Sequence, residues 1–136
     1  MNIFAWPVRV YYEDTDHGGV VYNANYLKFM ERSRTEWLRS KGLEQDELIE
    51  RHRLIFAVRS AALEFIRGAR FNDYLQVTAE PVEASRLKLV FVQRVFRGEP
   101  EQGELLCEGR VQVVSLNADS LQPWRMPRPI FEEIIS

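Results

Sequence analysis

The hydrophobic pattern of the chain has two parts: one segment with the period of a helix, and several segments with the pattern of strands. Between residues 24 and 41 apolar side chains recur at helical spacing, and charged residues fill the other faces. The apolar stripe comprises Tyr26, Phe29, Met30, Ser33 and Trp37. This pattern predicts one long amphipathic helix that ends before Gly42, a residue suited to the position after a helix. Ser33 is the small member of the stripe, so we expect another element to approach the helix closely there.

The rest of the chain has the pattern of strands joined by turns. Residues 8–12 (VRVYY) are β-branched and aromatic, which favours a strand, and residues 14–19 (DTDHGG) are typical of a loop. Longer strand patterns cover residues 55–65, 74–83, 87–96 and 104–116, with turns predicted at 68–73 and 98–103. A short helix is predicted at 46–52, and a terminal helical turn at 130–135.

Long strands joined by short turns indicate an antiparallel sheet. The order of one strand, a long helix, a short helix and four long strands predicts an α+β fold, with one apolar helix packed against about five strands. The length of 136 residues suits one domain, so residues 1–136 are assigned to a single domain. Long strands at the edges of an open sheet invite pairing, and we expect at least a dimer.

Composition and charge narrow the possible functions. The formal charge is −2 and the sequence pI is about 5.8, so the basic excess of a nucleic-acid-binding protein is absent. Cys107 is the only cysteine, which fits a reducing compartment and a role as a small buried hydrophobe. The sequence shows no signal-peptide pattern and no apolar run near the ~20 residues of a membrane span. We therefore expect a cytoplasmic protein, mature from Met1.

Residues 12–26 (YEDTDHGGVVYNANY) carry the candidate chemistry. They join two carboxylates, Asp14 and Asp16, to a glycine pair and to the start of the long helix. The first N–H groups of a helix have no partner within it and can hold a phosphate, a carboxylate or a developing oxyanion. A carboxylate on a loop beside that helix start can attack a carbonyl or activate water against it.

Three other interpretations of this segment compete with that one. In a purely structural interpretation Asp14 and Asp16 cap turns. Asn23 or Asn25 then caps the helix. A calcium loop is disfavoured because its twelfth position, normally a bidentate glutamate, is Asn25. A metal site is disfavoured because the ligand spacing is not that of zinc, and His17 is typical of polar surface. We expect no metal ion and no cofactor.

The same segment carries a family resemblance. Residues 10–26 follow the pattern V-x-Y-x-D-T-D-x-G-G-V-V-Y-x-A-N-Y, and the helix continues with F-x-E-R-x-R-T-E. With F-x-W-P-V-R-V-Y-Y before it and V-F-x-Q-R at residues 90–94, the chain resembles the 4-hydroxybenzoyl-CoA thioesterase family. More narrowly, it is similar to the YbgC-type acyl-CoA thioesterases associated with the Tol-Pal system. The resemblance covers nearly the whole chain. It implies a hotdog fold, in which an antiparallel sheet wraps a central helix, and a homo-oligomer that is a dimer or a dimer of dimers.

The resemblance also implies roles for individual residues. The family's catalytic aspartate, a nucleophile or a general base, falls on Asp16. The backbone N–H that polarises the substrate carbonyl falls on Asn23. Gly18, Gly19 and Tyr22 shape the approach to these two groups. Close relatives often carry histidine where this chain has Asn23, and the backbone donor survives this change because every non-proline residue has an N–H.

Two further positions follow from the resemblance. Coenzyme A needs a cationic partner for its phosphates, and relatives place a basic group at or near Arg86, with Lys88 beside it. An ordinary solvated strand end explains these charges equally well. Glu31 is a minor alternative to Asp16, because another branch of hotdog thioesterases uses a glutamate on the central helix.

The expected function is hydrolysis of acyl-CoA thioesters to the free acid and CoA. Acyl-CoA is the expected substrate, and acyl carrier protein is a further candidate partner. A hydratase or dehydratase is disfavoured because its chemistry needs a placed histidine, and the chain has only His17 and His52. The alternative that stays open is a non-catalytic acyl-thioester or acyl-carrier-protein binding scaffold in envelope lipid metabolism.

Overall fold

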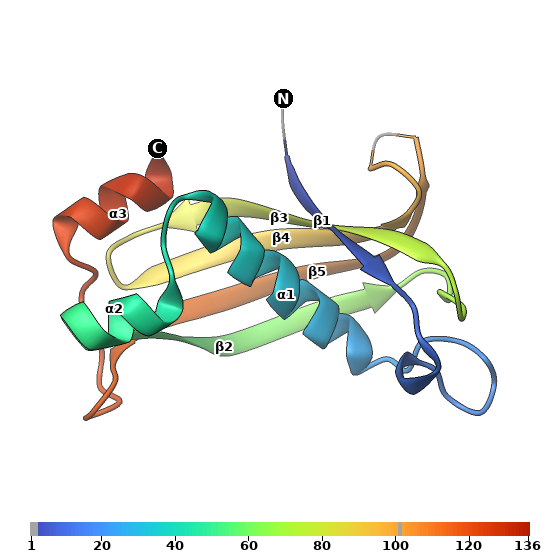
Figure 1. Ribbon diagram of the computed structural model, residues 1–136, viewed down its shortest axis with the longest axis horizontal. Helices are drawn as coiled ribbons and strands as arrows, with labels where there is room; N and C mark the ends of the chain where they lie inside the picture. Colours follow the sequence, from blue (N-terminus) through green and yellow to red (C-terminus); the bar gives the residue numbers. More distant parts are fainter. Residues whose placement is uncertain (1–2, 101) are drawn as a thin grey trace.

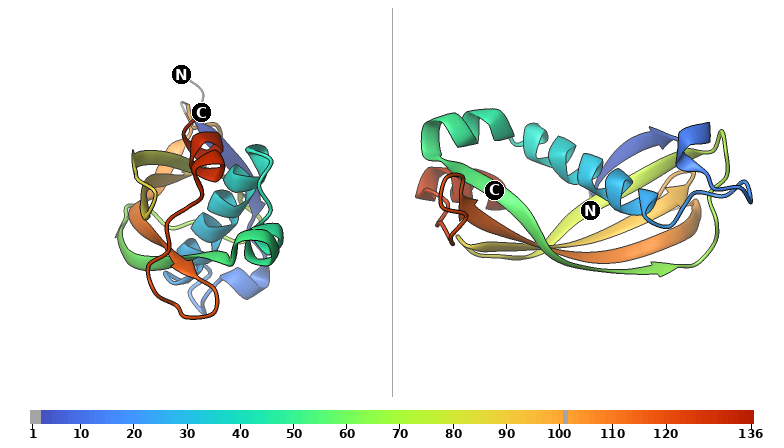
Figure 2. Two further views of the ribbon diagram at one scale, coloured as in Figure 1. Left: turned by 90° about the vertical axis from the view of Figure 1, so that its left-hand side faces the viewer. Right: turned by 90° about the horizontal axis from the view of Figure 1, so that it is seen from below.

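A five-stranded antiparallel sheet curves around one long helix (Figures 1 and 2). The computed structural model describes residues 3–100 and 102–136. The strands lie in the order β1-β3-β4-β5-β2. In chain order the elements are β1 (Phe4–Arg9), the 3-10 turn η1 (Tyr12–Asp14), α1 (Asn25–Ser40), α2 (Gln45–His52), β2 (Leu54–Phe65), β3 (Tyr74–Ala84), β4 (Lys88–Arg97), β5 (Glu104–Asn117) and α3 (Arg128–Ile135). This is the hotdog arrangement that the resemblance implies.

Helix α1 packs its apolar stripe on the sheet. Tyr26, Phe29 and Met30 are buried, and each such side chain stabilises the fold by roughly 1.5–3 kcal/mol. Ser33 is also buried, and its hydroxyl donates a hydrogen bond of 2.7 Å to the carbonyl oxygen of Val77 in β3. The close approach expected at this small residue is confirmed.

A buried polar residue, Gln93 of β4, lies beneath α1. Its amide nitrogen donates to the carbonyl oxygens of Met30 and Thr78, both at 3.0 Å. Its amide oxygen accepts a hydrogen bond of 2.9 Å from Arg34 Nη1. These partners satisfy and orient the amide, so they fix how α1 is rotated against the sheet.

Most predicted elements are confirmed, and their ends differ by one or two residues. The exception is the first strand, predicted at residues 8–12, which is wrong at both ends. Strand β1 spans Phe4–Arg9 and pairs only with β3, from Phe4 opposite Ala79 to Arg9 opposite Tyr74. Because β3 begins at Tyr74, the strand pairing stops at Arg9. Val10 still donates to the Asp73 carbonyl oxygen and accepts the Asn72 N–H, both at 2.9 Å, and the chain turns away after it. Residue 101 of the predicted 98–103 turn, and Met1 as the mature start, lie outside the described residues.

The two edges of the sheet are β1 and β2. Strand β2 is 12 residues long, mostly exposed, and pairs only with β5 in this chain. Val58, near its middle, is 52% exposed. A long, open and partly apolar edge of this kind favours pairing with another strand. Pairing of β2 with a second copy stays a prediction. No helix within residues 3–100 and 102–136 is long and apolar enough to cross a membrane.

Candidate active site

The loop between β1 and α1 is held together by Asp14. This residue is buried, and its carboxylate accepts hydrogen bonds of 2.9 Å from the Tyr11 N–H and from Asn25 Nδ2. Its carbonyl oxygen accepts the Tyr22 N–H at 2.9 Å. Asp14 therefore joins the end of the first strand segment to the start of α1 and positions everything between them. This is a structural role, as the capping interpretation predicted for this residue.

Asp16, two residues later, is exposed. Its Oδ1 accepts the Gly18 N–H at 2.8 Å, and its backbone N–H donates to the Val20 carbonyl oxygen at 2.8 Å. Gly19 has a φ of +82°, a conformation that favours glycine. No described residue donates a hydrogen bond to the second carboxylate oxygen, Oδ2. The glycine loop thus fixes one oxygen of Asp16 and leaves the other available to a substrate or a water molecule.

The start of α1 offers unpaired backbone donors next to this loop. Ala24 is the N-cap residue, and no side chain caps the helix. Within the described residues, the N–H groups of Asn23 and Ala24 find no acceptor, while their carbonyl oxygens accept from Tyr26 and Leu27. The suggestion that Asn23 or Asn25 caps the helix through its side chain is wrong, because the Asn25 amide is bonded to Asp14 instead. The free N–H groups carry the partial positive charge of the helix start.

The turn after β2, which the sequence did not mark as part of the site, contacts both the Asp16 loop and the start of α1. The Tyr26 hydroxyl accepts the Ala69 N–H at 3.1 Å, and the Val21 N–H donates to the Ala69 carbonyl oxygen at 2.8 Å. Burial raises the pKa of Tyr26, so its hydroxyl keeps its proton. The turn after β2 therefore anchors both the loop and the first turn of α1. In the sequence Tyr26 is indistinguishable from its neighbours in the apolar stripe.

Some of the other predicted site residues lie close to Asp16, and some lie far from it. Gly18 and Gly19 lie in the Asp16 turn, and Tyr22 precedes α1 with its side chain 58% exposed. Arg86 and Lys88 lie at the β3–β4 turn beside α3, at the opposite end of the sheet from the Asp16 loop (Figure 1). A single chain does not bring Arg86 to Asp16, so a site that uses both would draw Arg86 from another copy.

Arg86 is also tied to the C-terminal segment. Its Nε donates to the Met126 carbonyl oxygen at 2.8 Å, and its carbonyl oxygen accepts the Met126 N–H at 2.7 Å. These bonds leave the two terminal nitrogens of the guanidinium as the groups able to meet a phosphate.

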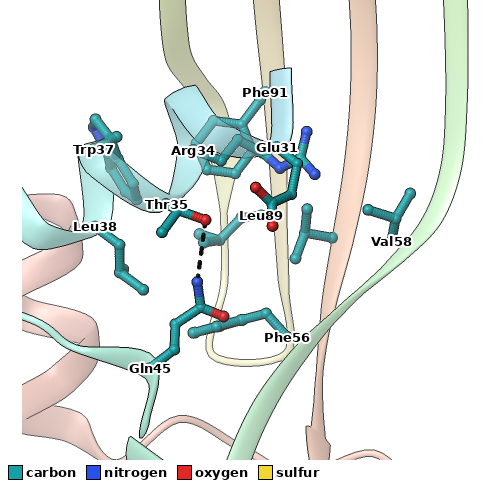
Figure 3. Close-up of a pocket in the computed structure, with 11 residues that line it drawn as sticks. Glu31, Arg34, Thr35, Trp37, Leu38, Gln45, Phe56, Val58, Leu89 and Phe91 are labelled. Atoms are coloured by element: carbon teal, nitrogen blue, oxygen red, sulfur yellow. Dashed lines mark hydrogen bonds between the residues drawn. The ribbon is translucent and has the colours of Figure 1, made fainter. Parts of the chain in front are cut away.

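Three further candidates from the sequence, two outside the loop and one within it, are Cys107, Glu31 and His17. Cys107 is fully buried, and burial raises its pKa to about 12, so it is no nucleophile at neutral pH. His17 is exposed. In the part of the chain that the structure describes, no group of three or more His, Cys, Asp or Glu side chains is arranged to hold a metal ion. Glu31 lines a cavity between α1 and the sheet rather than the Asp16 loop (Figure 3).

Comparison with known proteins identifies the family. The profile of the thioesterase-like superfamily matches residues 10–134. The acyl-CoA thioester hydrolase YbgC of Escherichia coli O6:H1 is 42% identical over 132 residues, which are 97% of this chain and 96% of that protein. The acyl-CoA thioesterase YbgC of Haemophilus influenzae is 39% identical over 95% of this chain and 92% of its own. A probable thioesterase from Bartonella henselae superposes with a TM-score of 0.85 at 30% identity, over 93% of this chain and all of that one.

The fold and the loop at the helix start define a hotdog protein of the thioesterase type. The chain belongs to the thioesterase-like superfamily. Within that superfamily, the YbgC acyl-CoA thioesterases match it over nearly its full length.

Proposed function

We propose that this protein hydrolyses acyl-CoA thioesters to the free acid and CoA, with Asp16 as the catalytic carboxylate. The observation that carries the proposal is that one loop, closed by the Asp14–Asn25 bond, holds both an exposed Asp16 carboxylate and the unpaired N–H groups at the start of α1. The carboxylate oxygen can attack a carbonyl carbon or activate water against it, and the positive helix start can stabilise the negative charge that develops on the carbonyl oxygen. The YbgC relatives are named for this activity.

In the proposed reaction the thioester carbonyl oxygen accepts a hydrogen bond from the Asn23 N–H. The free Oδ2 of Asp16 then attacks the carbonyl carbon, or removes a proton from a water molecule that attacks it. The negative charge that develops on the carbonyl oxygen is stabilised by the N–H and the helix dipole. Collapse of the tetrahedral species breaks the carbon–sulfur bond and releases CoA. In the first route a water molecule cleaves the resulting mixed anhydride, so both routes consume one water.

The test is Asp16→Asn, measured with a panel of acyl-CoA thioesters and a thiol-reactive dye. Loss of a catalytic carboxylate typically lowers the rate by about 10²–10⁴-fold. The melting temperature should stay near that of the parent, because Asp16 is exposed. Turnover near the parental rate would reject the assignment of Asp16. Binding of acyl-CoA by the parent without release of CoA, across the whole panel, would favour the non-catalytic scaffold instead.

The proposal extends to the assembly and its setting. We infer a homo-oligomer, a dimer or a homotetramer, because the open β2 edge and the distance of Arg86 from Asp16 both favour a second copy at the site. A cytoplasmic location, an association with the Tol-Pal system and acyl carrier protein as a partner belong to the same proposal, and the resemblance to YbgC-type proteins supports them. Light scattering after size exclusion tests the assembly, and an acyl-carrier-protein thioester assayed beside its CoA counterpart tests the donor.

A further inference from the structure

A cavity of about 150 Å³ lies between α1, α2 and the sheet (Figure 3), and Asp16 is not among the residues that line it. One side is apolar and is formed by Phe56, Leu89, Phe91 and Val113. The other side is polar and is formed by Glu31, Arg34, Thr35 and Gln45. The proposed hydrolysis uses none of these residues. A cavity with one apolar and one polar side suits a ligand that has the same two parts.

Arg34 is the unusual side chain of this cavity. Its guanidinium is half-buried and is held by Gln93, whose amide oxygen accepts one of its hydrogen bonds at 2.9 Å. Each described ion pair uses another cation, and no described carboxylate lies within 4.0 Å of Arg34. Burial lowers the pKa of Arg34, and the charge of Glu31 opposes that shift only in part. A desolvated cation without a counter-ion gains from binding an anion.

The neighbours of Arg34 add further donors to the polar side. Gln45 Nε2 donates to the Thr35 hydroxyl oxygen at 3.4 Å, which leaves the hydroxyl hydrogen of Thr35 free to donate (Figure 3). Glu31 is the acid on this side, and its charge opposes an anion. Its side chain is exposed and forms no ion pair with Arg34 among the described residues, so it can turn toward solvent. Donors therefore predominate, which suits a planar carboxylate on the Arg34 fork.

The cavity adjoins a second hollow that leads along α1 toward the start of the helix. The second hollow shares Glu31, Arg34 and Val58 with it and extends along α1 to Leu27, in the first turn of the helix. Lys28 and Arg32 also line this hollow, so cations border the whole groove. From Asn23 to Arg34 the helix advances about 16 Å. An arginine side chain on a helix points back toward the N-terminus, which shortens this distance. An acyl chain of medium length that starts at the Asn23 N–H can follow this groove to the guanidinium.

We propose that Arg34 binds a carboxylate at the far end of the acyl group, so that medium-length dicarboxylic acyl thioesters are preferred substrates. This inference rests on the proposed function. The apolar side of the cavity covers the methylene chain, and Arg34 and Thr35 hold the terminal carboxylate. Gln93 acts as a positioning residue, because it aims the guanidinium and touches no substrate.

The test compares matched substrates, suberoyl-CoA and octanoyl-CoA, which differ only in the terminal carboxylate. The measured quantity is the ratio of their kcat/KM values. Arg34→Met should lower this ratio by about tenfold or more, because a charge-assisted hydrogen bond contributes roughly 1.5–3 kcal/mol. Glu31→Gln removes the opposing charge and should raise the ratio severalfold. Arg39→Met, on the same helix but outside the cavity, is the matched control and should leave the ratio at the parental value.

Several outcomes would overturn the inference. The inference fails if neither Arg34→Met nor Glu31→Gln changes the ratio of the two kcat/KM values. It also fails if the parent prefers 8-hydroxyoctanoyl-CoA to suberoyl-CoA and Glu31→Gln removes that preference. If free octanoate inhibits the parent through Arg34 while suberoyl-CoA is not preferred, the cavity holds the acid product instead. If a second copy fills the groove, neither suberoyl-CoA, octanoyl-CoA nor free octanoate reaches Arg34, and Arg34→Met leaves both the ratio and any inhibition by octanoate unchanged, which also overturns the inference.

Two measurements keep this test separate from the proposed function. If the parent cleaves neither of these two substrates nor any other thioester of the panel, the hydrolase proposal fails, and calorimetric binding of suberate to the parent and to Glu31→Gln still tests the cavity. If Arg34→Met does not fold, the rise predicted for Glu31→Gln remains decisive, because that side chain is exposed. If the parent cleaves octanoyl-CoA and the folded variants show the parental ratio of kcat/KM values, the proposed function stands and this inference is refuted.

Discussion

Asp14 and Asp16 stand two residues apart, and the structure predicts opposite consequences for their replacement. The Asp14 carboxylate is buried and accepts two hydrogen bonds of 2.9 Å, from the Tyr11 N–H and from Asn25 Nδ2. Asp14→Ala removes both bonds and leaves the buried Asn25 amide and the part-buried Tyr11 N–H without partners. Hydrogen bonds to a charged acceptor contribute roughly 1.5–3 kcal/mol each, so we expect a loss of about 3–5 kcal/mol in unfolding free energy.

Asp14→Asn should be milder. The new amide can still accept one bond through its oxygen. The Asn25 amide can also rotate so that its own oxygen accepts from the new NH2 group. We therefore expect a loss of about 1–2 kcal/mol, since two neutral hydrogen bonds replace two charge-assisted ones.

Thermal melting at a fixed protein concentration measures both effects. For a domain of this size each kcal/mol lowers Tm by roughly 2–4 °C, so Asp14→Ala should melt about 6–20 °C below the parent. Asp119→Ala is the control, because it removes a carboxylate whose ion pair with Arg53 is exposed and contributes little.

Kinetics then separate the two aspartates. In a folded Asp14→Asn variant kcat should fall by about 10–100-fold, since the loop that carries Asp16 loses its anchor to α1 and orientation is degraded. Asp16→Asn should lose more activity and almost no stability. An Asp14→Ala protein that melts within a degree of the parent would refute the structural role given to Asp14.

Three further predictions each concern a single residue. At pH 8 a thiol reagent should leave Cys107 unmodified in the folded protein and label it after denaturation, because burial raises its pKa to about 12; rapid labelling of the folded protein contradicts this. Gly109→Ala should lower the unfolding free energy by about 1 kcal/mol in a denaturant titration, since its Cβ would lie 3.0 Å from the Met30 Cε, and Met30 is flexible enough to move. Arg86→Ala should raise KM for acyl-CoA about tenfold with little change for the matching pantetheine thioester, because a phosphate contact is charge-assisted; an equal rise for both thioesters would place Arg86 away from the phosphates.

The order and type of the elements were predictable because they depend on neighbouring residues. The period of the stripe from Tyr26 to Trp37 determines a helix with one buried face, and the small Ser33 in it indicated a close contact that Val77 supplies. The strand patterns after residue 54 gave four correct strands. The first strand was misplaced, because its end depends on where its distant partner β3 begins and not on its own side chains.

The site was predictable in outline and not in detail. The sequence by itself determined that an acidic, glycine-containing loop precedes a long helix, since both follow from local residue types. Asp14 and Asp16 have the same chemistry and similar neighbours. Only the folded chain decides that Asp14 is buried and Asp16 exposed, because that choice depends on the Tyr11 N–H of the same turn and on the Asn25 amide, which reaches the loop from α1.

Two further features belong to the tertiary structure alone. Arg34 is one of several arginines on α1, and the cavity beside it exists because α2 and three strands of the sheet meet α1 around that turn. Arg86 is a cation near a strand end in the sequence, and the folded sheet places it at the end opposite Asp16. Hydrophobic periodicity is a property of adjacent residues and is written in the sequence. The position of one side chain relative to another depends on contacts between distant segments, so only the packed structure decides it.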